Sequence, residues 1–156
     1  MECRMTRFTF CCCVMALAAC AKPDQKPAAD SMGAGATTPA VSLASVAGTW
    51  AMRTTNQRGD STLVTYQMIA SADAAGWSFN FPGRAPVPIR VIAVDGDSIV
   101  TEAGPYESVL RKGVQVTTHS VIRVNGANLV GTTVAHYQPG GADSVLYLRT
   151  EGTRAQ

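Results

Sequence analysis

Short runs of alternating apolar and polar residues dominate the chain from about residue 43 to its end. In one run, Val64, Tyr66 and Met68 alternate with Thr65 and Gln67. Alternation with a period of two places successive side chains on opposite faces of a β-strand, and Gly, Pro, Asn and Asp separate the runs as turn residues do. The pattern predicts antiparallel strands joined by short connections, and it predicts no long helix.

The alternation predicts eight or nine strands. They span residues 48–55, 63–70, 77–81, 89–94, 98–102, 106–111, 115–124, 128–137 and 143–150. An open sheet of this size leaves two edges free to pair with other chains, and closing the sheet removes both edges. We therefore predict an all-β domain, an antiparallel up-and-down meander closed into a barrel. A β-sandwich or a small barrel with a filled core is the alternative.

Two connections carry specific expectations. Gly104-Pro105 is expected to be a turn between two strands, because neither residue favours a continuous ladder. Residues 125–128, Asn-Gly-Ala-Asn, are expected to form a tight hairpin. That hairpin would place His119 opposite position 134, and therefore diagonal to His136 on the same face. No acidic residue or cysteine falls predictably beside the two histidines, so we predict no metal site.

The first 20 residues have a different pattern. Arg4 and Arg7 precede an apolar run from Phe8 to Ala19, and the run closes with Leu17-Ala18-Ala19-Cys20. A run of about a dozen residues is typical of a signal peptide and is too short to span a bilayer as a helix. The four closing residues resemble the bacterial lipobox. This resemblance implies cleavage before Cys20 and attachment of a diacylglyceryl group to its thiol.

The resemblance to the lipobox implies a division of the chain into a signal peptide (1–19), a lipidated cysteine with a flexible tether (20–42) and a barrel domain (43–156). Residues 21–40 contain almost no large apolar side chain, and a flexible segment of this length reaches about 25 Å. The expected partner is a lipid bilayer, reached through the Cys20 anchor. The expected location is the bacterial cell envelope. In some bacteria an aspartate directly after the lipidated cysteine favours retention in the inner membrane, and this chain has Ala21 at that position. We therefore expect the outer membrane, facing the periplasm, in a diderm source.

Cleavage also changes the composition of the mature chain. Cys3, Cys11, Cys12 and Cys13 leave with the signal peptide, so Cys20 is the one remaining thiol and no disulfide is expected. The mature chain keeps 11 basic and 10 acidic residues. Nucleic-acid binding usually requires a basic face, so this balance argues against a nucleic-acid partner.

Gly48-Thr49-Trp50, on the first predicted strand, resembles the opening motif of the lipocalins and their wider calycin relatives. In that family an arginine near the end of the last strand packs across the tryptophan and closes the barrel floor. The resemblance implies that Arg149 or Arg154 has this position. A guanidinium stacked on an indole contributes about 0.5 to 2 kcal/mol.

A small barrel can hold one small ligand among its inward side chains. The residues expected to form an apolar lining are Tyr66, Met68, Trp77, Phe79, Phe81 and Tyr137. The predicted function is binding of an apolar or amphipathic small molecule. The alternative is a non-catalytic structural or protein-interaction module of the envelope that has a filled core and acts through its outer surface.

A hydrolase is the third alternative. Glu102 and Glu107 would flank the Gly104-Pro105 turn and face each other, but a catalytic pair also needs a cleft that desolvates one carboxyl group. Ser108 and Ser120 lack a nucleophile elbow. We therefore predict no catalytic residue and no cofactor.

Overall fold

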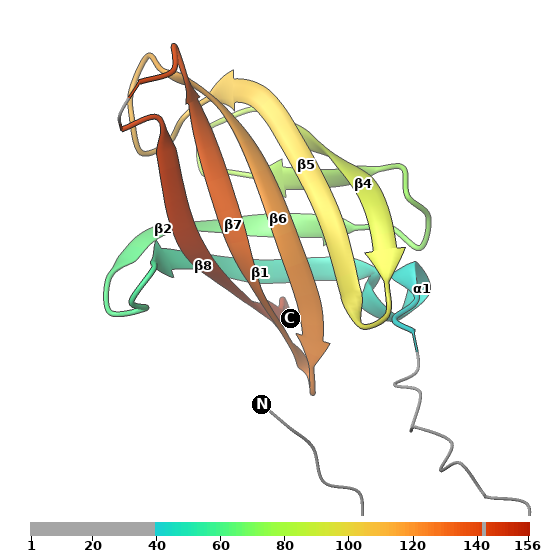
Figure 1. Cartoon of the computed structure of the whole chain (residues 1–156). Helices are drawn as coiled ribbons and strands as arrows, with labels where there is room; N and C mark the ends of the chain where they lie inside the picture. Colours follow the sequence, from blue (N-terminus) through green and yellow to red (C-terminus); the bar gives the residue numbers. More distant parts are fainter. Residues whose placement is uncertain (1–39, 142) are drawn as a thin grey trace, which may run out of the picture. The chain divides into compact units, whose positions relative to one another are not determined.

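The computed structural model describes residues 40–141 and 143–156, which contain one short helix and eight antiparallel strands (Figure 1). The predicted signal peptide, Cys20 and residues 21–39 of the predicted tether lie outside the described residues. The elements are α1 (Leu43–Val46), β1 (Gly48–Asn56), β2 (Thr62–Ala70), β3 (Trp77–Asn80), β4 (Val87–Asp95), β5 (Ser98–Glu107), β6 (Gln115–Asn125), β7 (Asn128–Gln138) and β8 (Val145–Arg154).

Each strand pairs with the next strand along the chain, and β1 also pairs with β8. The sheet is therefore a closed barrel in which all eight strands have a partner on both sides. The predicted all-β up-and-down barrel is confirmed, and the β-sandwich alternative is wrong. The architecture is consistent with a lipocalin-like barrel.

The predicted strand 98–102 and the first two residues of the predicted strand 106–111 form one strand, β5, so the count is eight and not nine. Residues 108–111, predicted as strand, lie instead in the connection between β5 and β6. The register between β5 and β6 shifts between Ala103 and Tyr106, which makes Gly104-Pro105 a bulge and not a turn. Gly104 has a φ of +121°, and a Cβ there would lie 2.6 Å from the Val116 carbonyl oxygen. Close approach of β6 therefore requires a glycine at this position.

The other connections follow the expected pattern more closely. Asn125 pairs with Asn128 across the predicted hairpin, and His119 pairs with Val134 as expected. The last strand is displaced toward the C-terminus, because β8 runs to Arg154 and not to residue 150. Its added residues pair with the start of β1.

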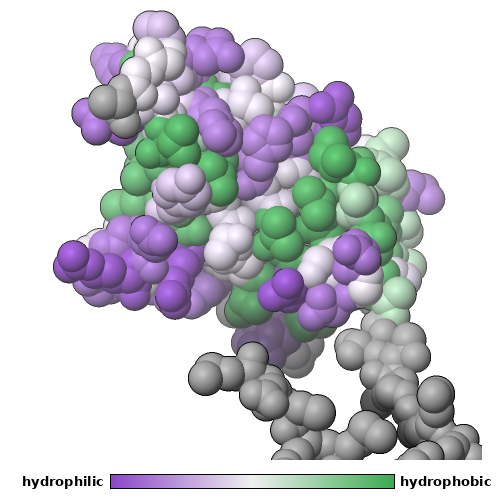
Figure 2. Space-filling view, in the orientation of Figure 1, coloured by the Kyte–Doolittle hydropathy of each residue, from purple (hydrophilic) through white to green (hydrophobic). Residues whose placement is uncertain are grey.

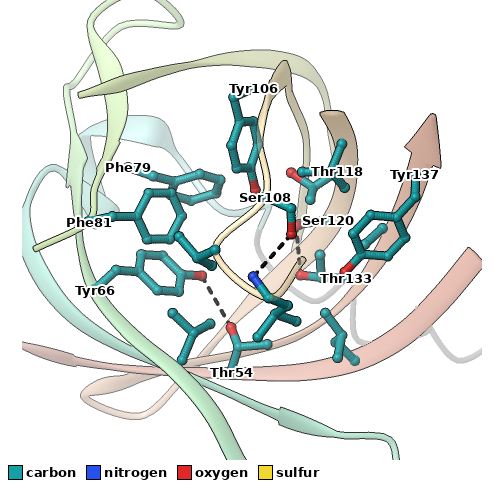
Figure 3. A pocket seen from close by; sticks show the side chains of 16 residues that line it. Thr54, Tyr66, Phe79, Phe81, Tyr106, Ser108, Thr118, Ser120, Thr133 and Tyr137 are labelled. Carbon is teal, nitrogen blue, oxygen red and sulfur yellow. Dashed lines mark hydrogen bonds between the residues drawn. The ribbon is translucent and has the colours of Figure 1, made fainter. Parts of the chain in front are cut away.

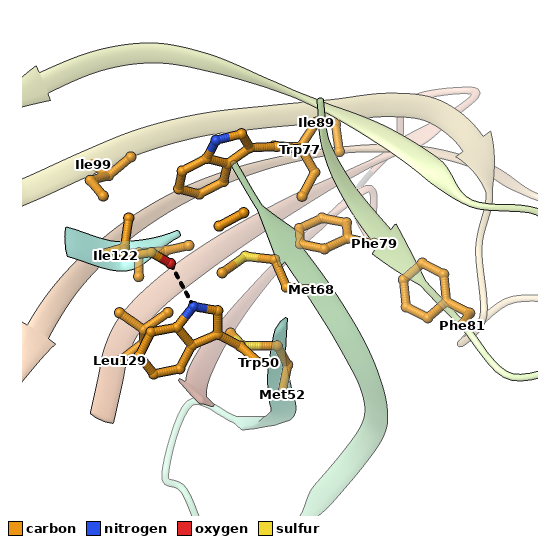
Figure 4. Close-up of a cluster of buried hydrophobic side chains, with 13 residues drawn as sticks. Trp50, Met52, Met68, Trp77, Phe79, Phe81, Ile89, Ile99, Ile122 and Leu129 are labelled. Carbon is orange, nitrogen blue, oxygen red and sulfur yellow. Dashed lines mark hydrogen bonds between the residues drawn. The ribbon is translucent and has the colours of Figure 1, made fainter. Parts of the chain in front are cut away.

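The end of the barrel near α1 is filled by an apolar core, which we call the floor cluster (Figure 4). It contains Val46, Trp50, Met52, Met68, Ala70, Trp77, Phe79, Phe81, Ile89, Ile99, Ala103, Ile122 and Leu129. Both tryptophans bury their rings and still satisfy their indole N–H groups. Trp50 Nε1 donates to the Val46 carbonyl oxygen at 2.8 Å, and Trp77 Nε1 donates to that of Asp73 at 2.8 Å. The floor is thus apolar without leaving these donors unpaired.

Arg154 lies across the outer side of the floor. Its guanidinium carbon is 4.4 Å from the centroid of the Trp50 ring. Its Nη1 and Nη2 atoms donate to the carbonyl oxygens of Ala47 and Ser45, both at 2.8 Å. A Cβ on Gly48 would lie 2.8 Å from Arg154 Nη1, so the glycine of the Gly-x-Trp motif leaves room for the guanidinium. Arg154 therefore joins the last strand to both α1 and β1.

Arg149, the other arginine suggested by the resemblance, points away from the interior. It is exposed on β8, opposite Thr55 on β1 and Thr132 on β7. Alternate residues of a strand face opposite sides, and the inward set on β8 includes Leu148, Thr150 and Gly152. Arg149 therefore belongs to the outer face and Arg154 to the floor.

We expect Arg154→Ala to lower the free energy of unfolding by roughly 2 kcal/mol, through loss of the indole contact and of two charge-assisted hydrogen bonds. Arg149→Ala is the matched control from the same strand, and its effect should stay within about 0.5 kcal/mol. Urea unfolding followed by tryptophan fluorescence measures both. Equal losses in the two variants would contradict the closing role of Arg154.

Candidate functional site

Beyond the floor cluster, the barrel interior contains a pocket of about 50 Å³ (Figure 3). One wall of this pocket is aromatic and the facing wall carries hydroxyl groups. The lining residues are Thr54, Val64, Tyr66, Phe79, Phe81, Tyr106, Ser108, Val109, Leu110, Val116, Thr118, Ser120, Thr133, Ala135, Tyr137 and Leu148. None of these side chains carries a charge at neutral pH.

The aromatic wall consists of Tyr66, Phe79, Phe81 and Tyr106. The ring centroids of Tyr66 lie 5.1 Å from those of both Phe79 and Phe81, and Phe81 stacks on Tyr106 at 5.9 Å. The ladder between β2 and β3 covers only three residue pairs, and β3 ends at Asn80. The rings pack at the place where this ladder stops. Packing of the aromatic rings thus joins the chain segments of the wall where the backbone pairing of β2 and β3 ends.

The facing wall carries a chain of hydroxyl groups, which we call the hydroxyl belt: Tyr66, Thr54, Thr150, Thr133 and Ser120. All of these except Thr150 line the pocket. The oxygen of Thr150 lies 3.3 Å from that of Thr54 and 3.0 Å from that of Thr133. Ser120 and Thr133 are 2.7 Å apart, and Thr54 Oγ1 donates to Tyr66 Oη at 3.4 Å. Five adjacent strands, β2, β1, β8, β7 and β6, each contribute one inward hydroxyl.

The belt and the aromatic wall meet at Tyr66. Burial raises the pKa of Tyr66 to about 12, and burial also raises the pKa of Tyr106. Both phenols are therefore neutral at physiological pH. Across the described part of the chain, every fully buried side-chain nitrogen or oxygen has a hydrogen-bond partner. The polar interior is thus compatible with a stable fold.

The segment between β5 and β6 lies over the pocket and contributes Ser108, Val109 and Leu110 to its lining. Ser108 Oγ accepts hydrogen bonds from the backbone N–H groups of Leu110 and Arg111, both at 3.0 Å. Arg84 Nη1 donates to the Glu107 carbonyl oxygen at 2.7 Å. These contacts hold Leu110 in place at the pocket.

A second arginine holds the other end of this segment. The Arg111 guanidinium carbon lies 4.0 Å from the centroid of the Tyr137 ring. Its Nη1 atom donates to the Asp143 carbonyl oxygen at 2.8 Å, which joins this segment to the connection between β7 and β8. The two connections are therefore linked at this end of the barrel.

Of the six residues expected to line the interior, Tyr66, Phe79, Phe81 and Tyr137 lie at the pocket. Phe79 and Phe81 belong both to the pocket and to the floor cluster, whereas Met68 and Trp77 belong to the floor cluster alone, with 0% and 2% of their surface exposed. The two sets separate because the inward positions of one strand lie at different depths of the barrel.

Sequence reasoning missed Tyr106 and the inward hydroxyls. Threonine and serine fit either face of a strand, and in an alternating pattern a polar residue indicates the outer face. The available signal was the parity of β6, where Thr118 and Ser120 lie between Val116 and Ile122 on the inward set. If every second residue from Val116 to Ile122 is assigned to the inner face, the hydroxyl groups of Thr118 and Ser120 also lie inside.

The carboxylates considered for catalysis do not face each other. Glu102 forms an ion pair with Arg90 and its Oε2 atom lies 3.4 Å from His119 Nδ1, whereas the Glu107 carboxylate accepts a hydrogen bond from the Gly113 N–H group. Both glutamates lie on β5, which explains their separation. The Ser108 hydroxyl accepts hydrogen bonds from backbone N–H groups of the segment between β5 and β6. The Ser120 hydroxyl is hydrogen-bonded to Thr133 in the hydroxyl belt.

Within residues 40–141 and 143–156, no group of three or more His, Cys, Asp or Glu side chains is placed to hold one metal ion. Within the same residues, no helix has the length and apolar character needed to cross a membrane.

Comparison with known proteins adds no relative: no family model, curated protein or solved structure matches the chain. Fold and site therefore define a class, a small closed eight-stranded β-barrel with an uncharged interior pocket.

The raised pKa of Tyr66 predicts that the folded protein loses stability as the pH rises from about 10 to about 12. In this range the unfolded tyrosine ionises while the folded one keeps its proton, so alkali favours unfolding. Tyr66→Phe should reduce this pH dependence and remove the phenolate absorbance step near pH 12. Urea unfolding at several pH values and ultraviolet titration measure the two effects. An unchanged titration curve in the variant would contradict the assignment.

Proposed function

We propose that this protein is a lipid-anchored lipoprotein of the bacterial cell envelope, and that its barrel binds a small, uncharged, apolar or amphipathic molecule. The observation that carries the binding proposal is the pocket in which an aromatic wall faces a hydroxyl belt. Such a pocket combines apolar surface with a few fixed polar groups, as small-molecule sites usually do.

The chemistry of the lining favours an uncharged ligand. A carboxylate or ammonium group transferred from water into this interior would find no opposite charge among the lining residues. A hydroxyl group donates one hydrogen bond and accepts two, so members of the belt can turn toward a ligand and still contact each other. A ligand hydroxyl or carbonyl group satisfies the belt, while its apolar part contacts the rings.

The volume of the pocket limits what it holds in this conformation. A cavity of about 150 Å³ accommodates benzene, whereas this pocket has about 50 Å³. It accepts the polar end of a molecule and a few carbon atoms. A longer ligand extends past Leu110 and displaces the segment between β5 and β6.

To test this proposal, isothermal titration calorimetry compares the full chain's binding of 1-octanol with that of octanoate. We expect 1-octanol to bind at least tenfold more tightly, because octanoate buries a charge. Thr133→Val should weaken 1-octanol binding about fivefold through loss of one hydrogen-bonding group. Thr132→Val, on the outer face of the same strand, should leave binding unchanged. Absence of 1-octanol binding, or equal effects of the two variants, would contradict the proposal.

A second candidate function, an interaction module that uses the outer surface, is favoured by the exposed apolar side chains. Figure 2 shows apolar patches separated by polar side chains on the face presented there. The large exposed apolar residues of the barrel are Leu63, Ile69, Ile92, Val94, Val121, Val124, Val145 and Tyr147. A barrel that takes up neither probe in the calorimetric experiment favours this second function.

The anchor proposal rests on the lipobox sequence Leu17-Ala18-Ala19-Cys20. We expect a bacterial host to incorporate labelled palmitate into the full chain and to retain the chain in its membrane fraction. Cys20→Ala should abolish the labelling, because the acceptor thiol is lost. Cys13→Ala, which removes a thiol from the signal peptide, should keep it. Labelling that survives Cys20→Ala would rule out this anchor.

A further inference from the structure

The two histidines of the chain meet on the outer face of the barrel, away from the pocket. We propose that His119 on β6 and His136 on β7 bind one divalent transition-metal ion, Zn²⁺, Ni²⁺ or Cu²⁺, with water molecules completing its coordination. The site is independent of the interior ligand site, because outward and inward side chains alternate along both strands.

The register places the two imidazoles side by side. His119 pairs with Val134 and His136 pairs with Thr117, so the histidines are diagonal neighbours on one face of an antiparallel pair. Their ring centroids lie 5.5 Å apart and the rings are nearly perpendicular, with an interplanar angle of 81°. Two imidazoles that each bind a metal at about 2.0 Å in tetrahedral geometry have centroids about 5 Å apart. The observed centroid distance is therefore close to that of two imidazoles bound to one ion.

Glu102 prepares His119 for this role. Its Oε2 atom lies 3.4 Å from His119 Nδ1, and its Oε1 atom contacts Arg90 across the β4–β5 ladder. A carboxylate beside Nδ1 favours a proton there, which leaves the lone pair of Nε2 free for a metal. Metal-binding histidines usually have such a carboxylate or carbonyl partner on the other ring nitrogen. Glu102 is therefore a positioning residue and not a ligand.

The surroundings decide the class of metal. Imidazole nitrogen suits Zn²⁺, Ni²⁺ and Cu²⁺, whereas Mg²⁺ and Ca²⁺ require oxygen ligands. The His119 side chain is 46% exposed, so water reaches the open coordination positions. With two protein ligands, the site binds reversibly and does not hold the fold together. Around the pair, Glu102 contributes negative charge, and Arg90, the neighbouring cation, is already paired with it.

A zinc titration of the full chain, its thiols blocked with iodoacetamide, tests this inference by nuclear magnetic resonance of the imidazole nitrogens. We expect both rings to shift with one shared midpoint and one equivalent of Zn²⁺. His136→Ala should weaken the zinc response of His119 at least tenfold, and His119→Ala should do the same to His136. Arg149→Ala, an outward change farther along β8, opposite Thr132, should leave the midpoint unchanged.

The role of Glu102 has a separate readout. In the metal-free protein, the nitrogen shifts of His119 should report a proton on Nδ1, and Glu102→Gln should reduce the population of that tautomer and weaken zinc binding about tenfold. Unchanged tautomer and affinity in this variant would overturn the role assigned to Glu102. Separate midpoints for the two rings, with each affinity unaffected by loss of the other histidine, would overturn the shared site.

Discussion

Pairing of β1 with β8 is the constraint on which the rest of this structure depends. It joins the two ends of the meander, so that each strand has two partners and the interior has a fixed circumference. An eight-stranded barrel is just wide enough for side chains to fill it or to enclose one small ligand. The same register sets Trp50 opposite Arg154, and through Arg154 it holds α1 against the floor. Closure therefore determines where the core lies and where the pocket begins.

The interior contains an apolar floor that stabilises the fold and a pocket to which the binding proposal assigns the ligand. In the floor cluster, buried apolar side chains supply hydrophobic stabilisation and the two indole N–H groups have backbone partners. Near the pocket, inward hydroxyls replace apolar groups and give up part of that stabilisation. Because the hydroxyls bond to one another, this region avoids the larger cost of unpaired buried polar groups. A polar interior of this kind supports a role beyond packing.

One wall of the barrel carries both proposed sites. On β6, Ser120 belongs to the hydroxyl belt while its neighbour His119 faces outward, and β7 has the same arrangement with Thr133 inside and His136 outside. Antiparallel pairing aligns the outward residues of neighbouring strands as regularly as the inward ones. This regularity brings His119, His136 and Glu102 together although Glu102 is 34 positions from His136 in the chain.

The sequence by itself determined the strand pattern, the Asn125–Asn128 hairpin and the diagonal relation of the two histidines, because these depend on local alternation and turn chemistry. Closure of the meander was predictable because an open sheet of this size would leave two edges free to pair with other chains. Tertiary structure alone decided that Gly104-Pro105 is a bulge, since close approach of β6 selects it. It also decided that Arg154 and not Arg149 meets Trp50, and that threonines line the pocket. The physical reason is that glycine, threonine and arginine suit several environments, so contacts between distant strands determine which one each residue occupies.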